Sequence, residues 1–200
     1  MHPNPAFRVG DEAALLEAVA AIGFAHLFVS TPDGPMVVHA PLTRAGDTLR
    51  FHIARGNRAT RYLSGATVLA SVVGAHGYIS PNWYAVPGDQ VPTWNYTAIE
   101  IEGVVAPLAE ADLIDQLDRL ATAHEPRVNP AAPWTRAKMD DAIFRKMLRA
   151  ILGFEIAVTA IRSTTKLSQN KPDIDRDGVI AGLRASNNAP LADDMEAAAR

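Results

Sequence analysis

Three arginines fall within residues 55–61 and form the strongest charge cluster in the chain. The cluster follows an expected strand and coincides with the start of a short expected helix. A helix start offers free N–H groups, and a guanidinium binds phosphate through paired hydrogen bonds. Arg55, Asn57 and Arg58 are therefore candidate phosphate ligands. A solvated helix face with loosely held charges is the alternative, and local sequence leaves both open.

Aromatic residues gather in residues 78–96, which hold two of the three Trp and three of the four Tyr. Pro81 and Pro92 confine the two halves of this stretch to extended or turn conformations. Aromatic rings beside polar groups, as in Trp94 and Asn95, suit a surface that takes a flat ligand. Aromatics at strand spacing are also common in sheet cores, so a packed hairpin stays open as the alternative.

A third polar set directly follows the last expected strand. It packs two cations and three amide or hydroxyl groups into residues 166–171. Such groups can hold a phosphate or a ring carbonyl, or they can cap their neighbours by local hydrogen bonds. The candidates are Lys166, Ser168, Gln169 and Asn170.

The residue patterns that disulfides, metal sites and the common catalytic motifs require are missing from the sequence. The chain has no cysteine, which excludes disulfides and thiolate chemistry. Its six histidines show no zinc-helix spacing, and only His52, beside the arginine cluster, is a candidate for a site. The alternating aspartates of residues 173–177 fit a capped helix better than a calcium loop. No nucleotide-binding or serine-hydrolase motif occurs, so we expect no metal and identify no catalytic residue.

Composition indicates which partners, which cellular location and how many domains we expect. A formal net charge of −3 and a pI of about 6.0 give no basic field for nucleic acid. No apolar run approaches the ~18 residues that a membrane span needs, and no signal peptide is visible. We expect a cytoplasmic protein with a single domain over residues 1–186. The small, acidic composition of residues 187–200 predicts a flexible tail.

Hydrophobic periodicity predicts a mainly β protein of the α+β class. A helix over residues 11–22 precedes a hairpin, a third strand and a near-continuous apolar strand over residues 66–73. Later segments alternate as strands at 97–105 and 154–161, with helices expected at 109–124, 135–151 and 173–183. The expected architecture is an antiparallel barrel with peripheral helices.

Several motifs in one order resemble the PaiB family of FMN-binding negative transcriptional regulators. They are Tyr78-Ile79-Ser80-Pro81-x-Trp83-Tyr84, Val91-Pro92-Thr93-Trp94-Asn95-Tyr96, Leu120-x-x-x-His124-Glu125, Lys166-Leu167-Ser168-Gln169-Asn170 and Asp175-Arg176-x-Gly178-Val179-Ile180-x-Gly182-Leu183. The resemblance implies a split β-barrel of the flavin-reductase and pyridoxamine-phosphate-oxidase type, acting as a homodimer with ligand sites in the dimer cleft.

The resemblance also implies roles for the candidate residues. Arg55, Asn57 and Arg58 occupy the strand-to-helix turn where split-barrel proteins hold the FMN phosphate. Trp94 and Asn95 are expected to face the cleft, and residues 166–170 to close it.

Three functions follow as hypotheses. The first is an FMN-binding regulator, for which the family description implies DNA but the acidic charge predicts weak, electrostatic DNA affinity. The second is a flavin-dependent oxidoreductase of a small molecule, in which the cofactor supplies the redox chemistry. The third is a binder of another planar cofactor such as haem, with His52 or His76 as the conceivable axial ligand.

Overall fold

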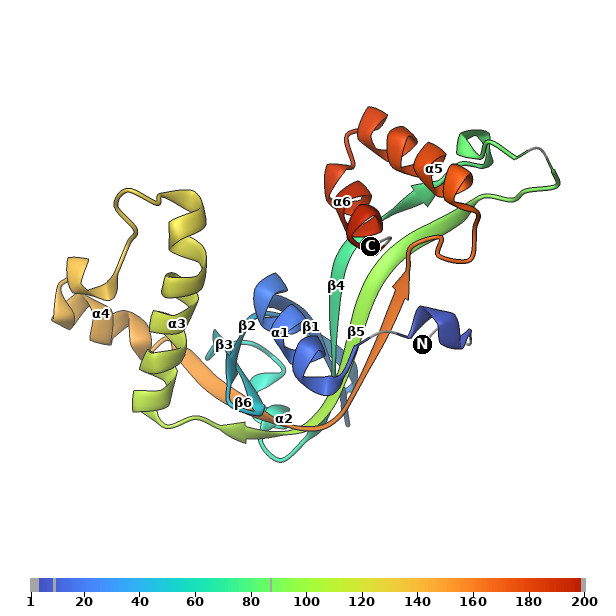
Figure 1. Ribbon diagram of the computed structural model, residues 1–200. Helices are drawn as coiled ribbons and strands as arrows, with labels where there is room; N and C mark the ends of the chain where they lie inside the picture. Colours follow the sequence, from blue (N-terminus) through green and yellow to red (C-terminus); the bar gives the residue numbers. More distant parts are fainter. Residues whose placement is uncertain (1–3, 9, 87, 199–200) are drawn as a thin grey trace. The chain divides into compact units, whose positions relative to one another are not determined.

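The protein is described here by a computed structural model that covers residues 4–8, 10–86 and 88–198 (Figure 1). Six strands form a closed barrel in the order β1-β2-β3-β6-β5-β4. Helices lie at the periphery, which confirms the predicted mainly β, α+β class. No helix in the described ranges combines the length and apolar character of a membrane span.

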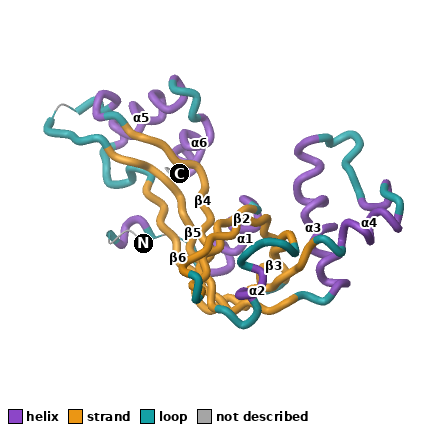
Figure 2. The backbone as a smooth tube through the Cα atoms, turned by 180° about the vertical axis from the view of Figure 1, so that it is seen from behind, coloured by secondary structure: helices purple, strands orange, loops and turns teal. Residues whose placement is uncertain are grey.

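The chain divides into two compact units. One unit contains residues 16–72 and 100–161, and we call it the barrel unit. The other contains residues 1–15, 73–99 and 162–200, and we call it the C-terminal unit. Strands β4 (Thr67–Ile79), β5 (Thr93–Pro107) and β6 (Ile151–Lys166) have residues in both, and Figure 2 draws each as one continuous strand. The single domain expected from sequence stays a prediction.

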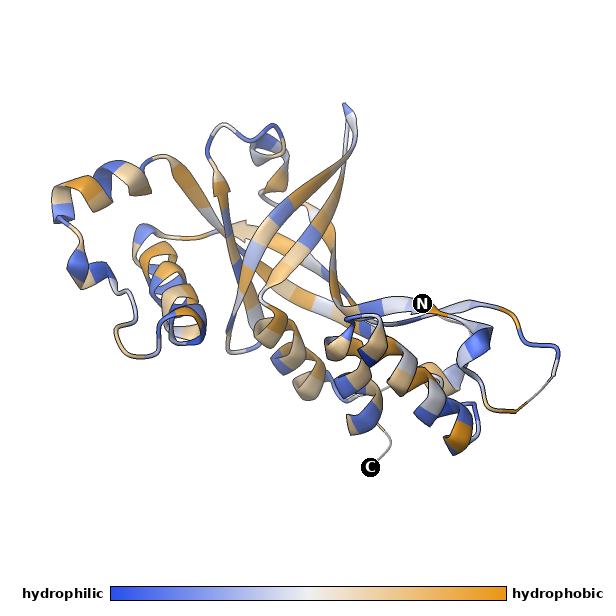
Figure 3. Cartoon of the chain, turned by 90° about the horizontal axis from the view of Figure 1, so that it is seen from above, coloured by the Kyte–Doolittle hydropathy of each residue, from blue (hydrophilic) through white to orange (hydrophobic). Residues whose placement is uncertain are grey.

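Alternation of apolar and polar residues builds the barrel unit. Strands β1 (Phe24–Thr31), β2 (Gly34–Ala45) and β3 (Thr48–Ala54) pair antiparallel in sequence. In β3, Leu49, Phe51 and Ile53 are buried while Arg50 and His52 lie on the other face. Alternating apolar and polar colours follow the strands in Figure 3. The near-continuous apolar run over residues 66–73 predicts a strand buried on both faces, but the first residues of β4 alternate between buried and partly exposed positions, so that prediction is wrong.

Helices complete the barrel unit. Helix α1 (Glu12–Ile22) and α3 (Glu110–Val128) begin and end near the predicted positions. The helix expected over residues 135–151 is instead a 3-10 turn, η3 (Arg136–Lys138), followed by α4 (Asp141–Leu148). Asp140 caps α4 by accepting the N–H of Ile143, which fixes the later start. The short α2 (Thr60–Leu63) follows β3.

The C-terminal unit has its own core. Helices α5 (Asp173–Ala185) and α6 (Ala189–Ala197) pack together, as Figure 1 shows, beside the turn η2 (Pro81–Trp83). Val179 and Leu183 of α5 are buried with Leu191 and Met195 of α6. A flexible tail was expected over residues 187–200, whereas residues 189–197 are helical. Burial of two large side chains against α5 stabilises this helix despite its weak sequence pattern.

Candidate functional site

The arginine cluster lies where β3 ends in the barrel unit. Asn57 Oδ1 accepts the N–H of Ala59 at 2.9 Å and so shapes the turn that leads to α2. Arg55 and Arg58 are exposed on either side of it. The predicted strand-to-turn placement of these three residues is therefore what the structure has.

These two arginines are not held by carboxylates. At least eight of the described arginines form ion pairs with carboxylates. Among the described residues, Arg55 and Arg58 have no carboxylate partner, and neither do Arg127 and Arg149. Arg55 Nε instead donates to the carbonyl of Arg149 at 2.9 Å, just after α4. A cation at a helix C-terminus is stabilised by the helix dipole, so Arg55 has a structural role even without a ligand.

His52 lies three residues before this turn and is half-buried. Its Nδ1 is 3.1 Å from Oε1 of Gln116, a fully buried residue of α3. Burial lowers the pKa of His52 below its ordinary value, and the bond to Gln116 only partly opposes this. The neutral ring is therefore favoured, with one nitrogen engaged inside the protein.

An exposed aromatic shelf lies on β4 and β5 in the C-terminal unit. The Trp94 ring stacks on His76 with centroids 6.1 Å apart, and Tyr78 meets Trp94 edge-on at 6.3 Å. Trp94 is 49% exposed and Tyr78 51%. Rings held in place yet open to solvent can stack on a flat ligand.

Asn95 has the opposite environment to its neighbour Trp94. Its side chain is fully buried, and Nδ2 donates to Ser168 Oγ at 2.8 Å. Its Oδ1 is buried without a hydrogen-bond partner in the described chain. Successive side chains of a strand point to opposite faces, which separates Trp94 and Asn95.

Internal hydrogen bonds hold most of the third predicted set. Lys166 Nζ donates to Thr93 Oγ1, and burial lowers the pKa of Lys166. Gln169 Oε1 accepts the N–H of Leu167 at 2.7 Å, and its Nε2 donates to the carbonyl of Thr165 at 2.6 Å. Asn170 is exposed. This loop therefore behaves largely as the self-capping alternative describes.

The ten candidate residues thus form two groups. His52, Arg55, Asn57 and Arg58 belong to the barrel unit, at the end of β3. Trp94, Asn95, Lys166, Ser168, Gln169 and Asn170 belong to the C-terminal unit. Within that unit, Asn95 contacts Ser168, and Lys166 contacts the residue before Trp94.

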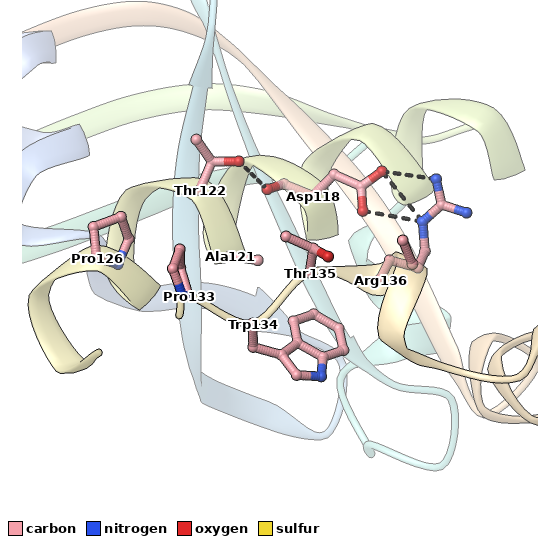
Figure 4. A pocket seen from close by; sticks show the side chains of 9 residues that line it. Asp118, Ala121, Thr122, Pro126, Pro133, Trp134, Thr135 and Arg136 are labelled. Atoms are coloured by element: carbon pink, nitrogen blue, oxygen red, sulfur yellow. Dashed lines mark hydrogen bonds and ion pairs between the residues drawn. The ribbon is translucent and has the colours of Figure 1, made fainter. Parts of the chain in front are cut away.

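Sequence reasoning missed the pockets of the barrel unit. One, of about 400 Å³, lies between α3 and the loop that carries Trp134 (Figure 4). Arg136 forms a double hydrogen bond with Asp118 at its edge, which raises the pKa of Arg136. A second, of about 530 Å³, lies between α1, β2 and α3 and includes His124. The Leu120-x-x-x-His124-Glu125 motif could have indicated the second pocket, which His124 lines. Glu125 Oε2 accepts the N–H of Trp134, a residue of the first pocket.

Known proteins are similar to this chain in sequence and in fold. A family model described as "Putative FMN-binding domain" matches residues 1–160. The protease synthase and sporulation protein PAI 2 of Bacillus subtilis (strain 168) is 29% identical over 187 residues, which cover 91% of this chain and 88% of that protein.

Solved structures share the fold at low identity. The FAD and haem binding protein of Mycobacterium smegmatis matches with a TM-score of 0.59 and 19% identity, over 88% of this chain and 80% of that chain. The flavocytochrome Anf3 of Azotobacter vinelandii matches with a TM-score of 0.60 and 13% identity, over 88% and 78%. These similarities confirm the predicted split-barrel class.

Proposed function

The chain belongs to the FMN-binding domain family whose model spans its first 160 residues, and we propose that it binds FMN with Arg55 and Arg58 holding the phosphate. The similarity to the Bacillus relative agrees with the resemblance to PaiB seen in the motifs. The observation that carries the phosphate site is that two exposed arginines, without a carboxylate partner in the described ranges, lie on the same turn at the end of β3.

The residues at this turn fit a phosphate. A phosphate carries close to two negative charges, and two guanidinium groups can neutralise it through several charge-assisted hydrogen bonds. Asn57 fixes the backbone between them. A Cβ added at Gly56 would meet no atom within 4 Å, so the turn is open on that side.

The C-terminal unit carries a separate surface for a flat ligand. We propose that the aromatic shelf of His76, Tyr78 and Trp94 can stack on a flat ring, because these rings pack against one another and are exposed. The hydrogen bond from buried Asn95 to Ser168 joins β5, which carries Trp94, to the loop that follows β6. When bound, the flavin would supply redox chemistry, while this chain supplies binding and orientation.

The role that we propose is regulation in response to flavin, in line with the sporulation function in the relative's name. Direct DNA affinity is expected to be weak, since the net charge is −3.

A small-molecule oxidoreductase is the second candidate function, and oxidation of NAD(P)H by the FMN-loaded protein would favour it. A cytoplasmic location stays a prediction.

We also propose a homodimer that uses an apolar strip on the outside of the barrel. Exposed Phe28 of β1 lies beside Val37 of β2 and Leu69 of β4 in the strand register. Exposed Val104 of β5 adds to the apolar surface of the barrel unit. Contiguous apolar area of this kind is what a two-fold partner covers.

The FMN proposal is tested by quenching of FMN fluorescence on titration with protein. We expect a dissociation constant in the micromolar range or tighter, and Arg58→Ala should weaken it at least about tenfold, equivalent to 1.4 kcal/mol. Arg145→Ala is the matched control, because Arg145 is exposed but paired with Asp141. Equal affinity of the wild type and Arg58→Ala would contradict the phosphate site.

A further inference from the structure

The pocket of about 530 Å³ beside His124 is independent of the flavin proposal. It lies wholly in the barrel unit, between the end of α1, the second half of β2 and the middle of α3. Its apolar wall includes Ala20 and Ala123. Its polar wall includes Thr43, Arg44, Arg119 and His124, together with two aspartates.

Thr43 carries a buried hydroxyl that has no partner. The residue is 7% exposed, and its Oγ1 makes no hydrogen bond within the described chain. Thr43 follows inward-facing Leu42 in β2, so it lies on the outer face of the barrel, where α3 also contacts β2. A buried hydroxyl without a partner is costly, and because Oγ1 is itself closed off from the pocket, a ligand group would remove that cost only after the Thr43 side chain rotates toward it.

His124 lies in the same wall and packs closely against Gly23. A Cβ added at Gly23 would lie 2.8 Å from His124 Nε2, so a larger residue there would require the ring to shift. Gly23 also has φ +71°, a conformation that glycine adopts without strain. The ring is half-buried, and no hydrogen bond of His124 is found across the described ranges.

Two arginines add donors to the pocket. Arg44 uses Nε and Nη1 for Gly46 and Glu17, and Arg119 uses Nε for Asp115. The remaining guanidinium nitrogens make no hydrogen bond to another described residue. The carboxylates are engaged, since Asp115 also accepts from Arg50 and Asp118 forms a double hydrogen bond with Arg136. The pocket therefore offers unused donors and few unused acceptors.

We propose that this pocket binds a small aliphatic monocarboxylate. Its carboxylate would accept hydrogen bonds from His124 and from the free nitrogens of Arg44 and Arg119, and from Thr43 once that side chain rotates toward the pocket. Its short chain would contact the apolar wall. A single negative charge suits the site better than a phosphate dianion, because Asp115 and Asp118 lie in the same lining and would repel the second charge.

The test is titration with butyrate, followed by NMR of the histidine ring signals, with His124→Gln used to assign His124. We expect saturable shifts of the His124 signals with a dissociation constant on the order of 1 mM. Thr43→Val should weaken butyrate binding about tenfold, the effect of a 1.4 kcal/mol loss. It should also raise the thermal midpoint of the free protein by about 2–4 °C, because the unpaired hydroxyl is removed.

Controls separate this site from general binding. Thr67→Val makes the same change at an exposed strand position and should leave both readouts unchanged. Butanol and inorganic phosphate should shift the His124 signals far less than butyrate. If Thr43→Val does not fold, Arg119→Gln, at an exposed residue of α3, is the second variant and should also weaken butyrate binding. No saturable shift by about 10 mM butyrate, an equal response to butanol, or unchanged binding in the folded variants would overturn the proposal.

Discussion

His52 lies behind the arginine turn with its Nδ1 against Gln116, and its environment sets a pH dependence of stability. Burial lowers the pKa of His52 in the folded protein, so the unfolded chain binds this proton more readily. Stability from the neutral ring is therefore present above the ordinary histidine pKa of about 6.5 and is lost as pH falls through the folded pKa.

We predict that the free energy of unfolding falls between pH 7 and pH 5, and that His52→Gln falls less steeply. Denaturant unfolding at a series of pH values measures both slopes, and comparing them removes the carboxylates shared by the two proteins. His39→Gln, at an exposed position, is the control and should keep the wild-type slope. A slope that is equal in His52→Gln and the wild type would contradict the assignment.

Burial also decides which polar residues are accessible to a ligand. The burial of an individual residue cannot be read directly from the sequence. Trp94 and Asn95 were both expected to face a cleft, yet one is 49% exposed and the other is fully buried. Strand alternation contains this information once β5 is known to extend back to Thr93. The turn from Arg55 to Arg58 was predicted well because charge clusters seldom lie in a core.

At the scale of elements, two glycines of α5 bring it close to η2. A Cβ at Gly182 would lie 2.4 Å from the Trp83 ring, and one at Gly178 would lie 2.1 Å from the Trp83 carbonyl oxygen. Gly178 and Gly182 are four residues apart and therefore share one helix face. This contact explains the four-residue spacing of Gly178 and Gly182 in the motif that begins at Asp175.

We predict that Gly178→Ala destabilises the protein by about 1–3 kcal/mol, the usual cost of overpacking, although alanine favours a helix. The obstacle is backbone, which cannot rotate away as a side chain does. Chemical denaturation measures the change. Gly56→Ala, which meets no atom within 4 Å, is the control. A Gly178→Ala variant as stable as the wild type would show that α5 and η2 are not in close contact.

Periodicity predicted most elements but not their full lengths. Helix α1, the first hairpin and β3 follow from apolar spacing that local sequence displays. Strand β4 was expected to end before Gly74, yet it continues to Ile79. Gly77, inside this strand, lies close to the Asn188 side chain, since a Cβ there would lie 2.5 Å from Nδ2. Such tertiary contacts, like the burial of α6, leave little trace in local sequence.

At the scale of the whole molecule, the apolar strip on the barrel predicts self-association. We expect sedimentation at micromolar concentration to give a dimer, and Phe28→Glu to give a monomer, because a buried unpaired charge is costly. Val128→Glu, at an exposed residue near the end of α3, is the control and should remain dimeric. A wild-type monomer, or a Phe28→Glu dimer of unchanged affinity, would contradict this surface.

The most direct test of the central claim is to compare FMN with riboflavin, which has the same ring system without the phosphate. If Arg55 and Arg58 hold the phosphate, the wild type should bind FMN at least about tenfold more tightly than riboflavin, a difference of 1.4 kcal/mol. Arg58→Ala should reduce that preference while leaving riboflavin affinity unchanged. Equal affinity of the wild type for the two flavins, or no binding of either, would contradict an FMN phosphate site at this turn.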